Sequence, residues 1–161
     1  MITNYSEKEV IKGRKSIFLA GPTPRSKETV SWRPEAIEIL NKLDFDGIVY
    51  IPEYGINVGD IDNDKQFAWE LEALEEATTI VFWVPRKLPE MPAFTTNVEF
   101  GYWLRTNKVV YGRPDGAEHV GYLDRLYKFS TNKNPVNNLE QLLKEGESLC
   151  NALVDHIKLS K

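Results

Sequence analysis

A glutamate at position 99 is the residue of this sequence best placed for covalent chemistry. It lies in the segment Pro92-Ala-Phe-Thr-Thr-Asn-Val-Glu-Phe-Gly-Tyr-Trp103, which follows the most strongly apolar run of the chain. We expect a helix to begin inside this segment. An acidic side chain near a helix N-terminus is held ionised by the helix dipole. An ionised carboxylate in such a place could act as a nucleophile at neutral pH.

The same segment also has a purely structural interpretation. Thr96-Asn-Val-Glu99 matches the S/T-x-x-E capping box, in which Glu99 would accept a hydrogen bond from the backbone N–H of Thr96. Gly101 favours the functional interpretation, because glycine inside a helix costs about 1 kcal/mol relative to alanine. Close packing of backbone or ligand against Gly101 would explain that cost. We therefore expect Glu99 to face a ligand, with the capping box as the alternative.

Common cofactor and metal motifs are missing from the sequence. The run Ile17-Phe-Leu-Ala-Gly-Pro22 ends a predicted strand, but neither the G-x-G-x-x-G fingerprint nor a G-x-x-x-x-G-K-[ST] loop occurs. The alternating aspartates of residues 60–64 resemble the start of an EF-hand, yet Lys65 and Leu71 stand where that loop needs Gly and Glu. We interpret them as an acidic turn with a helix cap. The single cysteine, Cys150, excludes a Cys-based zinc site. We predict neither a cofactor nor a metal ion.

Apolar runs and helix-period segments alternate along the chain. We predict strands at residues 15–20, 47–52, 79–85 and 108–111. We predict helices at residues 32–43, 64–77, 96–107, 121–129 and 138–158. Strands separated by helices predict a single α/β domain over residues 1–161, with a parallel sheet covered by helices on both faces. Residues 1–14 are expected to form a flexible N-terminal segment.

The predicted elements also say where a site would form. In a sheet of this kind, ligands bind beyond the carboxyl ends of the strands, near the point where the strand order reverses. The loops after Ala20, Pro52, Pro85 and Tyr111 are therefore expected to build the site. On the helix at 64–77, the spacing of the apolar side chains predicts a buried face, which consists of Phe67, Leu71, Leu74 and Ala77.

Composition restricts the class of ligand. The chain has 161 residues and a formal net charge of −4, which argues against a nucleic acid polymer as the main partner. Its start is polar, and it holds no run of 18 apolar residues. We therefore expect a cytoplasmic protein that neither spans nor binds a membrane, and a small molecule as its ligand.

Five short motifs together resemble the nucleoside 2-deoxyribosyltransferase-like family. They are Ile17-Phe-Leu-Ala-Gly-Pro22, Ser31-Trp-Arg-Pro-Glu-Ala36, Trp69-Glu70, Phe82-Trp-Val-Pro-Arg86 and Thr95-Thr-Asn-Val-Glu-Phe-Gly-Tyr102. The resemblance extends from about Ser16 to Arg125. It implies a flavodoxin-like (Rossmann-like) fold and a homo-oligomer. It also implies a nucleoside or nucleotide and a free nucleobase as small-molecule partners.

The resemblance implies roles for two glutamates. The glutamate of the family's E-[FLI]-G-Y or E-x-G motif matches Glu99 and would attack C1′ of a 2′-deoxynucleoside. The base leaves, and a second base resolves the glycosyl-enzyme ester, so that the overall reaction exchanges one base for another. An acidic residue on the helix before the central strand commonly protonates the base, and Glu70 is our candidate. Trp69, beside it, could stack on the base.

Two positions depart from the better-known branch of the family. Phe18 replaces a tyrosine that orients the nucleophile, and Ala93 replaces an Asp or Ser six residues before the nucleophile. We therefore expect other residues to contact the sugar. The residues that we predict to bind substrate are Phe18, Gly21, Pro22, Trp69, Thr95, Thr96 and Asn97.

Three arginines near the same edge of the sheet could hold a 5′-phosphate by forked hydrogen bonds. They are Arg25, Arg33 and Arg86. Two alternatives to base exchange stay open. The first is an N-glycoside hydrolase with the same nucleophile, in which water takes the second step. The second is a nucleotide-binding module without turnover, which Phe18 in place of the tyrosine favours.

Overall fold

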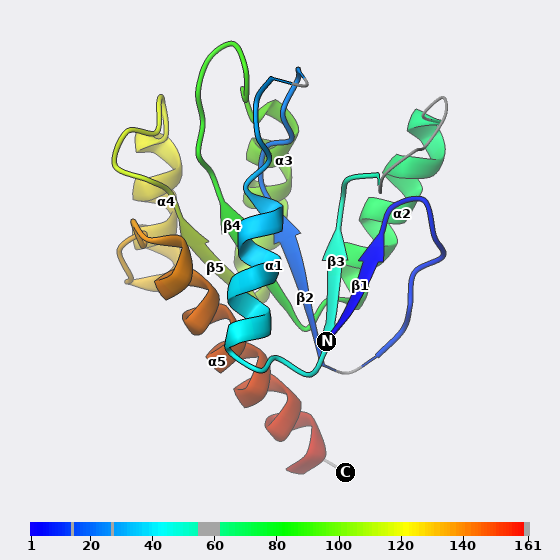
Figure 1. The fold of residues 1–161 in the computed structure, drawn as a ribbon. Helices are drawn as coiled ribbons and strands as arrows, with labels where there is room; N and C mark the ends of the chain where they lie inside the picture. The colour runs from blue at the N-terminus through cyan, green and yellow to red at the C-terminus, as the bar shows by residue number, and fades with distance from the viewer. Residues whose placement is uncertain (14, 27, 55–61, 160–161) are drawn as a thin grey trace.

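A five-stranded parallel sheet forms the centre of the protein. In a computed structural model, residues 1–13, 15–26, 28–54 and 62–159 are described. The strands are β1 (Ile2–Tyr5), β2 (Ser16–Ala20), β3 (Ile48–Ile51), β4 (Thr79–Trp83) and β5 (Val109–Gly112). Their order across the sheet is β1-β3-β2-β4-β5, and every pairing is parallel (Figure 1).

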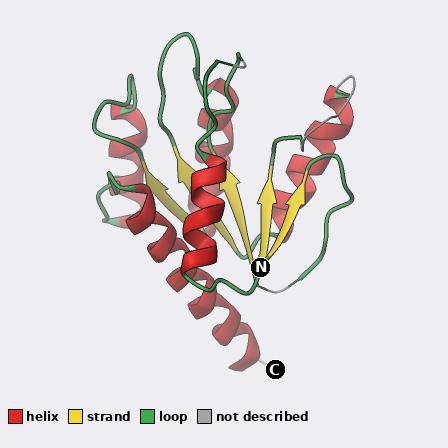
Figure 2. Ribbon diagram, viewed as in Figure 1, coloured by secondary structure: helices red, strands yellow, loops and turns green. Residues whose placement is uncertain are grey.

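Helices cover both faces of this sheet (Figure 2). One face packs against α1 (Arg33–Lys42) and α5 (Leu139–Leu159), and the opposite face against α2 (Asn63–Glu76), α3 (Phe94–Trp103) and α4 (Gly121–Thr131). A short 3-10 helix, η1 (Leu104–Thr106), follows α3. This is the single-domain, flavodoxin-like α/β arrangement that the sequence predicts.

The central strands owe their position to unbroken apolar character. Successive side chains of a strand point to opposite faces, so a strand covered on both sides must be apolar throughout. In β2, Phe18 and Ala20 enter the core beneath α2, α3 and α4, whereas Ile17 and Leu19 enter the core beneath α1 and α5. Such strands are readily predicted from sequence.

Strand β1 and the boundaries of α3 differ from our predictions. β1 lies within the segment that we expected to be flexible, and its backbone pairs with β3 from Ile2↔Ile48 to Tyr5↔Ile51. Only four residues of β1 pair, and their side chains mix polar with apolar character, so no periodic signal marks the strand. α3 begins at Phe94, two residues before the predicted start at Thr96.

Helix α2 is rotated relative to the predicted buried face. Of the four predicted residues, Leu74 and Ala77 are buried, whereas Phe67 and Leu71 are 62% and 43% exposed. Trp69 and Ala73 are buried in their place. Asp62 caps the helix by accepting hydrogen bonds from the backbone N–H groups of residues 64 and 65, as the interpretation of an acidic turn with a cap predicts. Residues 60 and 61 of that turn lie outside the described residues.

The strand order reverses at β2. From this strand the chain proceeds through α1 to β3 on one side, and β4 and β5 lie on the other side. The segments after β2 and β4 thus lead to helices on opposite faces of the sheet, which leaves a crevice between the two carboxyl ends. The fold therefore places the ends of β2 and β4 where ligands of such sheets bind.

Candidate active site

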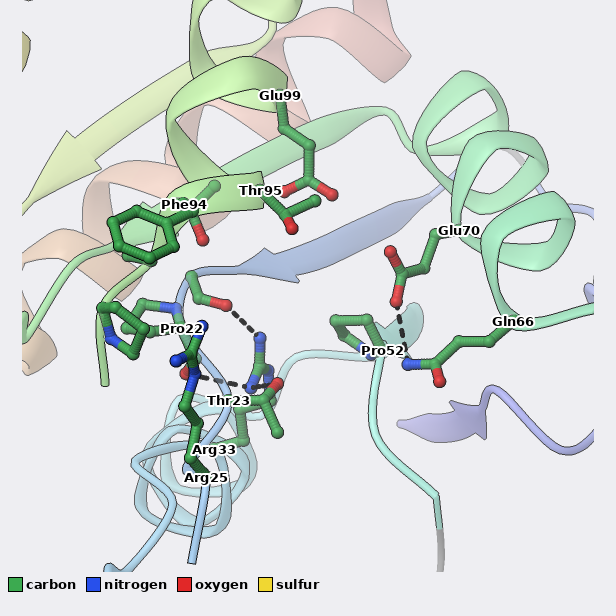
Figure 3. Close-up of a pocket in the computed structure, with 14 residues that line it drawn as sticks. Pro22, Thr23, Arg25, Arg33, Pro52, Gln66, Glu70, Phe94, Thr95 and Glu99 are labelled. Atoms are coloured by element: carbon green, nitrogen blue, oxygen red, sulfur yellow. Dashed lines mark hydrogen bonds between the residues drawn. The ribbon is translucent and has the colours of Figure 1, made fainter. Parts of the chain in front are cut away.

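A cavity of about 240 Å³ lies in this crevice. Typical pockets for drug-sized ligands hold about 300–1,000 Å³, so this one suits a small molecule. The segments after β2, β3 and β4 and the first turns of α2 and α3 supply its walls (Figure 3). The described residues that line it are Gly21, Pro22, Thr23, Arg25, Arg33, Pro52, Gln66, Glu70, Pro92, Ala93, Phe94, Thr95, Thr96 and Glu99. Three of the four predicted loops contribute, whereas the loop after β5 does not.

The loop after β2 can form only with glycine at position 21. Gly21 has a φ of 150°, and a Cβ atom there would lie 2.1 Å from the backbone oxygen of Trp83 on β4. The indole N–H of Trp32 donates to the carbonyl oxygen of Pro22 at 3.2 Å and fixes the next residue. Gly21 and Pro22, which we predicted to bind substrate, therefore form a rigid wall of the cavity.

Arg33 is a structural cation rather than an open phosphate-binding group. Its side chain is 1% exposed, and its guanidinium donates to carbonyl oxygens of the β2 loop, to the Thr23 hydroxyl at 3.1 Å and to Glu53 at 2.5 Å. The carbonyl oxygens belong to Leu19, Gly21 and Pro22. Because these five acceptors occupy the guanidinium, Arg33 holds the loop in place and contributes positive charge to the wall.

Glu99 faces the cavity and does not cap its own helix. The N-cap of α3 is Ala93, in a left-handed conformation with a φ of 57°, and no side chain caps the helix. Side chains of a helix lean toward its N-terminus, so the Glu99 carboxyl lies over the preceding turn, next to Thr95 (Figure 3). No described residue donates a hydrogen bond to it. The capping-box interpretation of Thr96 and Glu99 is therefore wrong.

The expectation that Glu99 is held ionised by the helix dipole is also wrong. Burial and, to a smaller extent, the negative charge of Glu70 together raise its pKa to about 7, although the positive charge of Arg33 lowers it. Glu99 lies in the second turn of α3, where the influence of the dipole has faded. Desolvation therefore prevails, and Glu99 exchanges its proton near neutral pH.

Glu70 enters the same cavity from α2. Burial raises the pKa of its carboxyl, whereas a hydrogen bond from Gln66 and the charge of Arg33 lower it. The Gln66 amide nitrogen donates to Glu70 Oε1 at 3.0 Å, one helical turn away. The negative charge of Glu70 in turn raises the pKa of Glu99, so the protonation of Glu99 is coupled to that of Glu70. The cavity thus places two glutamates that can exchange a proton on two of its walls.

Phe18 and Trp69 lie in the core and not among the cavity-lining residues. Phe18 is 1% exposed and Trp69 6%, and their ring centroids are 6.3 Å apart. Tyr50 packs edge-on against the same indole at 6.4 Å. The Trp69 ring packs in the core and does not line the cavity. This arrangement does not support the predicted stacking of Trp69 on a base.

Asn97 and Arg86 interact with each other outside the cavity lining. Arg86 donates to Asn97 Oδ1 and, at 2.7 Å, to the carbonyl oxygen of His119. This pairing ties the first turn of α3 to the segment before α4. Thr95 and Thr96, which we predicted to bind substrate, line the cavity, and Thr96 is 3% exposed.

Arg25 is the predicted phosphate-binding residue that lines the cavity with an exposed side chain. Its guanidinium lies over the Phe94 ring, 5.6 Å from the centroid. Within the described part of the chain, no side-chain hydrogen bond involves this guanidinium.

Sequence reasoning missed six of the described cavity residues and one supporting group. Glu53 supports the site by binding Arg33. The missed residues of the lining are Thr23, Pro52, Gln66, Pro92, Ala93 and Phe94. A usable signal existed for Gln66, since it lies one helical turn before Glu70 and must share its face of the helix. Glu53 carried no comparable signal, because its pairing with Arg33 is decided by the tertiary fold.

A metal site and a membrane span find no support in the described residues. Among residues 1–13, 15–26, 28–54 and 62–159, no three His, Cys, Asp or Glu side chains gather as metal ligands would. Across those same ranges, every helix is too short or too polar to cross a bilayer.

Comparison with known proteins identifies the family. No protein of curated function matches the chain in sequence. Residues 14–117, however, match the profile of the family described as nucleoside 2-deoxyribosyltransferase like. This match covers β2 to β5 and therefore every described residue of the cavity. The chain belongs to the nucleoside 2-deoxyribosyltransferase-like family.

Proposed function

We propose that this protein exchanges the base of a 2′-deoxynucleoside through a covalent glycosyl-enzyme intermediate on Glu99. One observation carries the proposal: the Glu99 carboxyl lies in a small cavity, accepts no hydrogen bond from the described residues, and is electrostatically coupled to a second glutamate. A carboxylate left without partners at a cavity wall is available to bond to a carbon atom.

In the first step, one oxygen of ionised Glu99 bonds to C1′ while the C1′–N bond breaks. The electron pair of that bond goes to the base, and protonated Glu70 gives its proton to a ring nitrogen. The transition state resembles an oxocarbenium ion, which the negative charge of Glu99 stabilises. In the second step, a new base attacks C1′, Glu99 leaves as a carboxylate, and Glu70 takes up the proton that the incoming base releases.

The shared proton must move within the pair before this step. In the empty site it rests on Glu99, whose pKa is raised to about 7 by burial and by the charge of Glu70. A bound nucleoside places a ring nitrogen, which accepts a hydrogen bond, beside Glu70 and an electron-poor carbon beside Glu99. Both contacts favour the proton on Glu70, so substrate binding itself prepares the nucleophile.

Arg25 is our candidate for a 5′-phosphate contact, should the substrate carry one. It lines the cavity, and its exposed guanidinium leaves donors for an anion. Arg33 and Arg86 are less suited, because both guanidiniums donate to the protein's own oxygens.

A homo-oligomer remains part of the proposal. The outer side of α3 carries three apolar side chains, Phe94, Val98 and Tyr102, which are 65%, 73% and 71% exposed. Gly101 lies on the same side, and a Cβ atom there would meet nothing within 4 Å. Packing within the chain therefore does not explain this glycine, whereas close approach of a second copy would. Light scattering of the wild type and of Val98→Asp tests this contact.

The function is tested by incubating the protein with each 2′-deoxynucleoside and a different free base. We expect base exchange by the wild type and a loss of at least about 10³-fold in Glu99→Ala. Release of base without incorporation of the acceptor would identify the hydrolase. Tight nucleoside binding without release of base, unchanged in Glu99→Gln, would identify a binding module and contradict the proposal.

A further inference from the structure

Gln66 is a cavity residue that the reaction described so far does not use. It lies one helical turn before Glu70 on α2, so the two side chains share one side of the helix, and both line the cavity. Gln66 is half-buried, and its amide nitrogen donates to Glu70 Oε1 at 3.0 Å. The two side chains therefore form a hydrogen-bonded pair on the α2 wall.

This hydrogen bond is the only one that the Glu70 carboxyl makes with the described residues. The charged side chains that share the cavity with Glu70 are Arg25, Arg33 and Glu99, and within the described part of the chain none of them bonds to it. A glutamate side chain can adopt several staggered rotamers. The contact with Gln66 therefore determines how the carboxyl of Glu70 is turned.

The same contact decides which oxygen of Glu70 carries the proton. An amide nitrogen can only donate, so the oxygen that faces it must present a lone pair. Oε1 is that oxygen, and the proton of the acid therefore belongs on Oε2. The second oxygen of Glu70 points away from Gln66 (Figure 3), and no described residue donates to it. The proton is thus held on the oxygen that stays open to a ligand.

The contact also changes in strength when Glu70 gives up its proton. A hydrogen bond to an ionised acceptor is about twice as strong as one to a neutral acceptor. The bond from Gln66 therefore strengthens as Glu70 becomes a carboxylate, and an interaction that strengthens along the reaction lowers its barrier. Burial raises the pKa of Glu70, and among the influences that lower it the hydrogen bond from Gln66 is the largest.

We propose that Gln66 is a positioning residue for the acid: it turns Glu70 so that Oε2 carries the proton, and it stabilises the carboxylate that remains once the leaving base has taken that proton. This inference rests on the proposed function for the role of Glu70. Gln66 itself transfers no proton and forms no bond to the substrate in this account.

The first test measures the acid directly and requires no turnover. The carboxyl carbon of Glu70 is titrated by NMR in Glu99→Gln, which removes the coupled proton, and again after adding Gln66→Met. Methionine keeps the length of the side chain and removes both hydrogen-bonding groups. We expect the acid dissociation constant of Glu70 to fall about tenfold in the double variant, because its carboxylate has lost its donor.

The second test is the pH profile of base release. At about pH 5.5, below the Glu99 pKa of about 7, the pair holds its proton, and Gln66→Met should release base about tenfold more slowly than wild type. Its alkaline decline should begin at a higher pH, because Glu70 then holds its proton more tightly. An electron-poor base that leaves without protonation should be released at the wild-type rate.

Gln141→Met is the matched control. Gln141 also donates to a glutamate one turn later, Glu145, but on an exposed part of α5 outside the cavity. This variant should leave the acid dissociation constant of Glu70 and the rates of base release unchanged. In Glu70→Gln, adding Gln66→Met should alter the rate by less than about twofold, because no acid is left to position.

A purely structural role of Gln66 would slow the release of every base alike and leave the titration of Glu70 where it was. Either result would overturn the inference, whether or not bases are exchanged. A tenfold change in the titration of Glu70, in a protein that never releases a base, would support the action of Gln66 on Glu70 and contradict the proposed function. Base exchange through Glu99 with no effect of Gln66→Met would support the function and contradict the inference.

Discussion

Two ionisable side chains lie on the walls of one cavity, Arg33 buried and Glu99 half-buried, and their surroundings differ in an informative way. Arg33 is 1% exposed and donates to five oxygens, among them the carboxylate of Glu53. Glu99 accepts no hydrogen bond from the described residues, and burial raises its pKa to about 7. The first arrangement stabilises a charge, and the second leaves a carboxyl group available to a ligand.

The difference distinguishes a residue that stabilises the fold from one that can interact with a ligand. A buried charge with a full set of partners is bound to the fold and cannot respond to a ligand. A buried carboxyl without partners lacks the stabilisation that a ligand can supply, and its raised pKa is the sign of that lack. Arg33 thus holds the β2 loop, whereas Glu99 is free to react.

The largest expected effect on stability comes from removing the charge of Arg33, which donates hydrogen bonds to five oxygens. Arg33→Met removes the guanidinium that donates to five oxygens and leaves the Glu53 carboxylate without its cation, so we expect a loss of about 3–5 kcal/mol in the free energy of unfolding. Urea denaturation measures it. Arg25→Met, at an exposed arginine of the same cavity, should change stability by less than about 0.5 kcal/mol. Equal losses in the two variants would contradict the division between scaffold and site.

Removing the proton donor should affect the rate and spare the fold. Glu70→Gln cannot protonate the leaving base, so we expect base release to slow by about 10²–10⁴-fold. An electron-poor base leaves without protonation. The rate of its release from a 2′-deoxynucleoside should therefore fall much less in Glu70→Gln. Glu75→Gln, an exposed position on the same helix, is the control and should keep the wild-type rate. A uniform loss across leaving groups would contradict the role of Glu70 as the acid.

The coupled pair predicts a decline of activity at alkaline pH. Above the Glu99 pKa of about 7 the pair holds no proton, so Glu70 has none to give and kcat/KM should fall about tenfold per pH unit. In Glu70→Gln the nucleophile loses its negative neighbour, its pKa falls, and the remaining activity should stay level to high pH. Steady-state rates from pH 5 to 9 measure both profiles. An alkaline decline that persists in Glu70→Gln would assign it to another group.

The smallest effect is a gain in stability when Glu99 is neutralised. Its folded pKa of about 7 exceeds the unfolded value, so wild-type stability is fully present below the unfolded pKa and is lost as pH rises to about 7. Discounted for partial exposure to solvent, the loss is about 1–2 kcal/mol. Glu99→Gln should therefore be more stable than wild type by that amount at pH 8 and nearly equal at pH 4, as chemical denaturation can show. Glu38→Gln, at an exposed position on α1, should show no such difference.

The sequence was sufficient to predict strands β2 to β5 and the helix that carries Glu99. β2 and β4 are apolar on both faces, and this leaves a buried parallel strand as the best interpretation. β1 could not be predicted, because a four-residue edge strand carries no periodic signal and exists only through its pairing with β3. Local patterns therefore identified the strands whose burial on both faces makes their sequences apolar throughout.

Side-chain roles within the site were predicted less well, for two physical reasons. Trp69 and Glu70 are neighbours on α2, and the rotation of the helix decides which one enters the core; the exposed Phe67 and Leu71 suggested a different rotation. For Arg33, the sequence shows a cation near a loop but not the five oxygens that surround it. Rotation and partner choice are set by tertiary packing.

The most direct measurement is the mass of the protein after brief incubation with a 2′-deoxynucleoside and no acceptor base. The account predicts an added deoxyribosyl group that peptide mapping places on Glu99, that disappears when an acceptor base is added, and that is absent from Glu99→Gln. An adduct on a different residue, or turnover by Glu99→Gln at the wild-type rate, would contradict it.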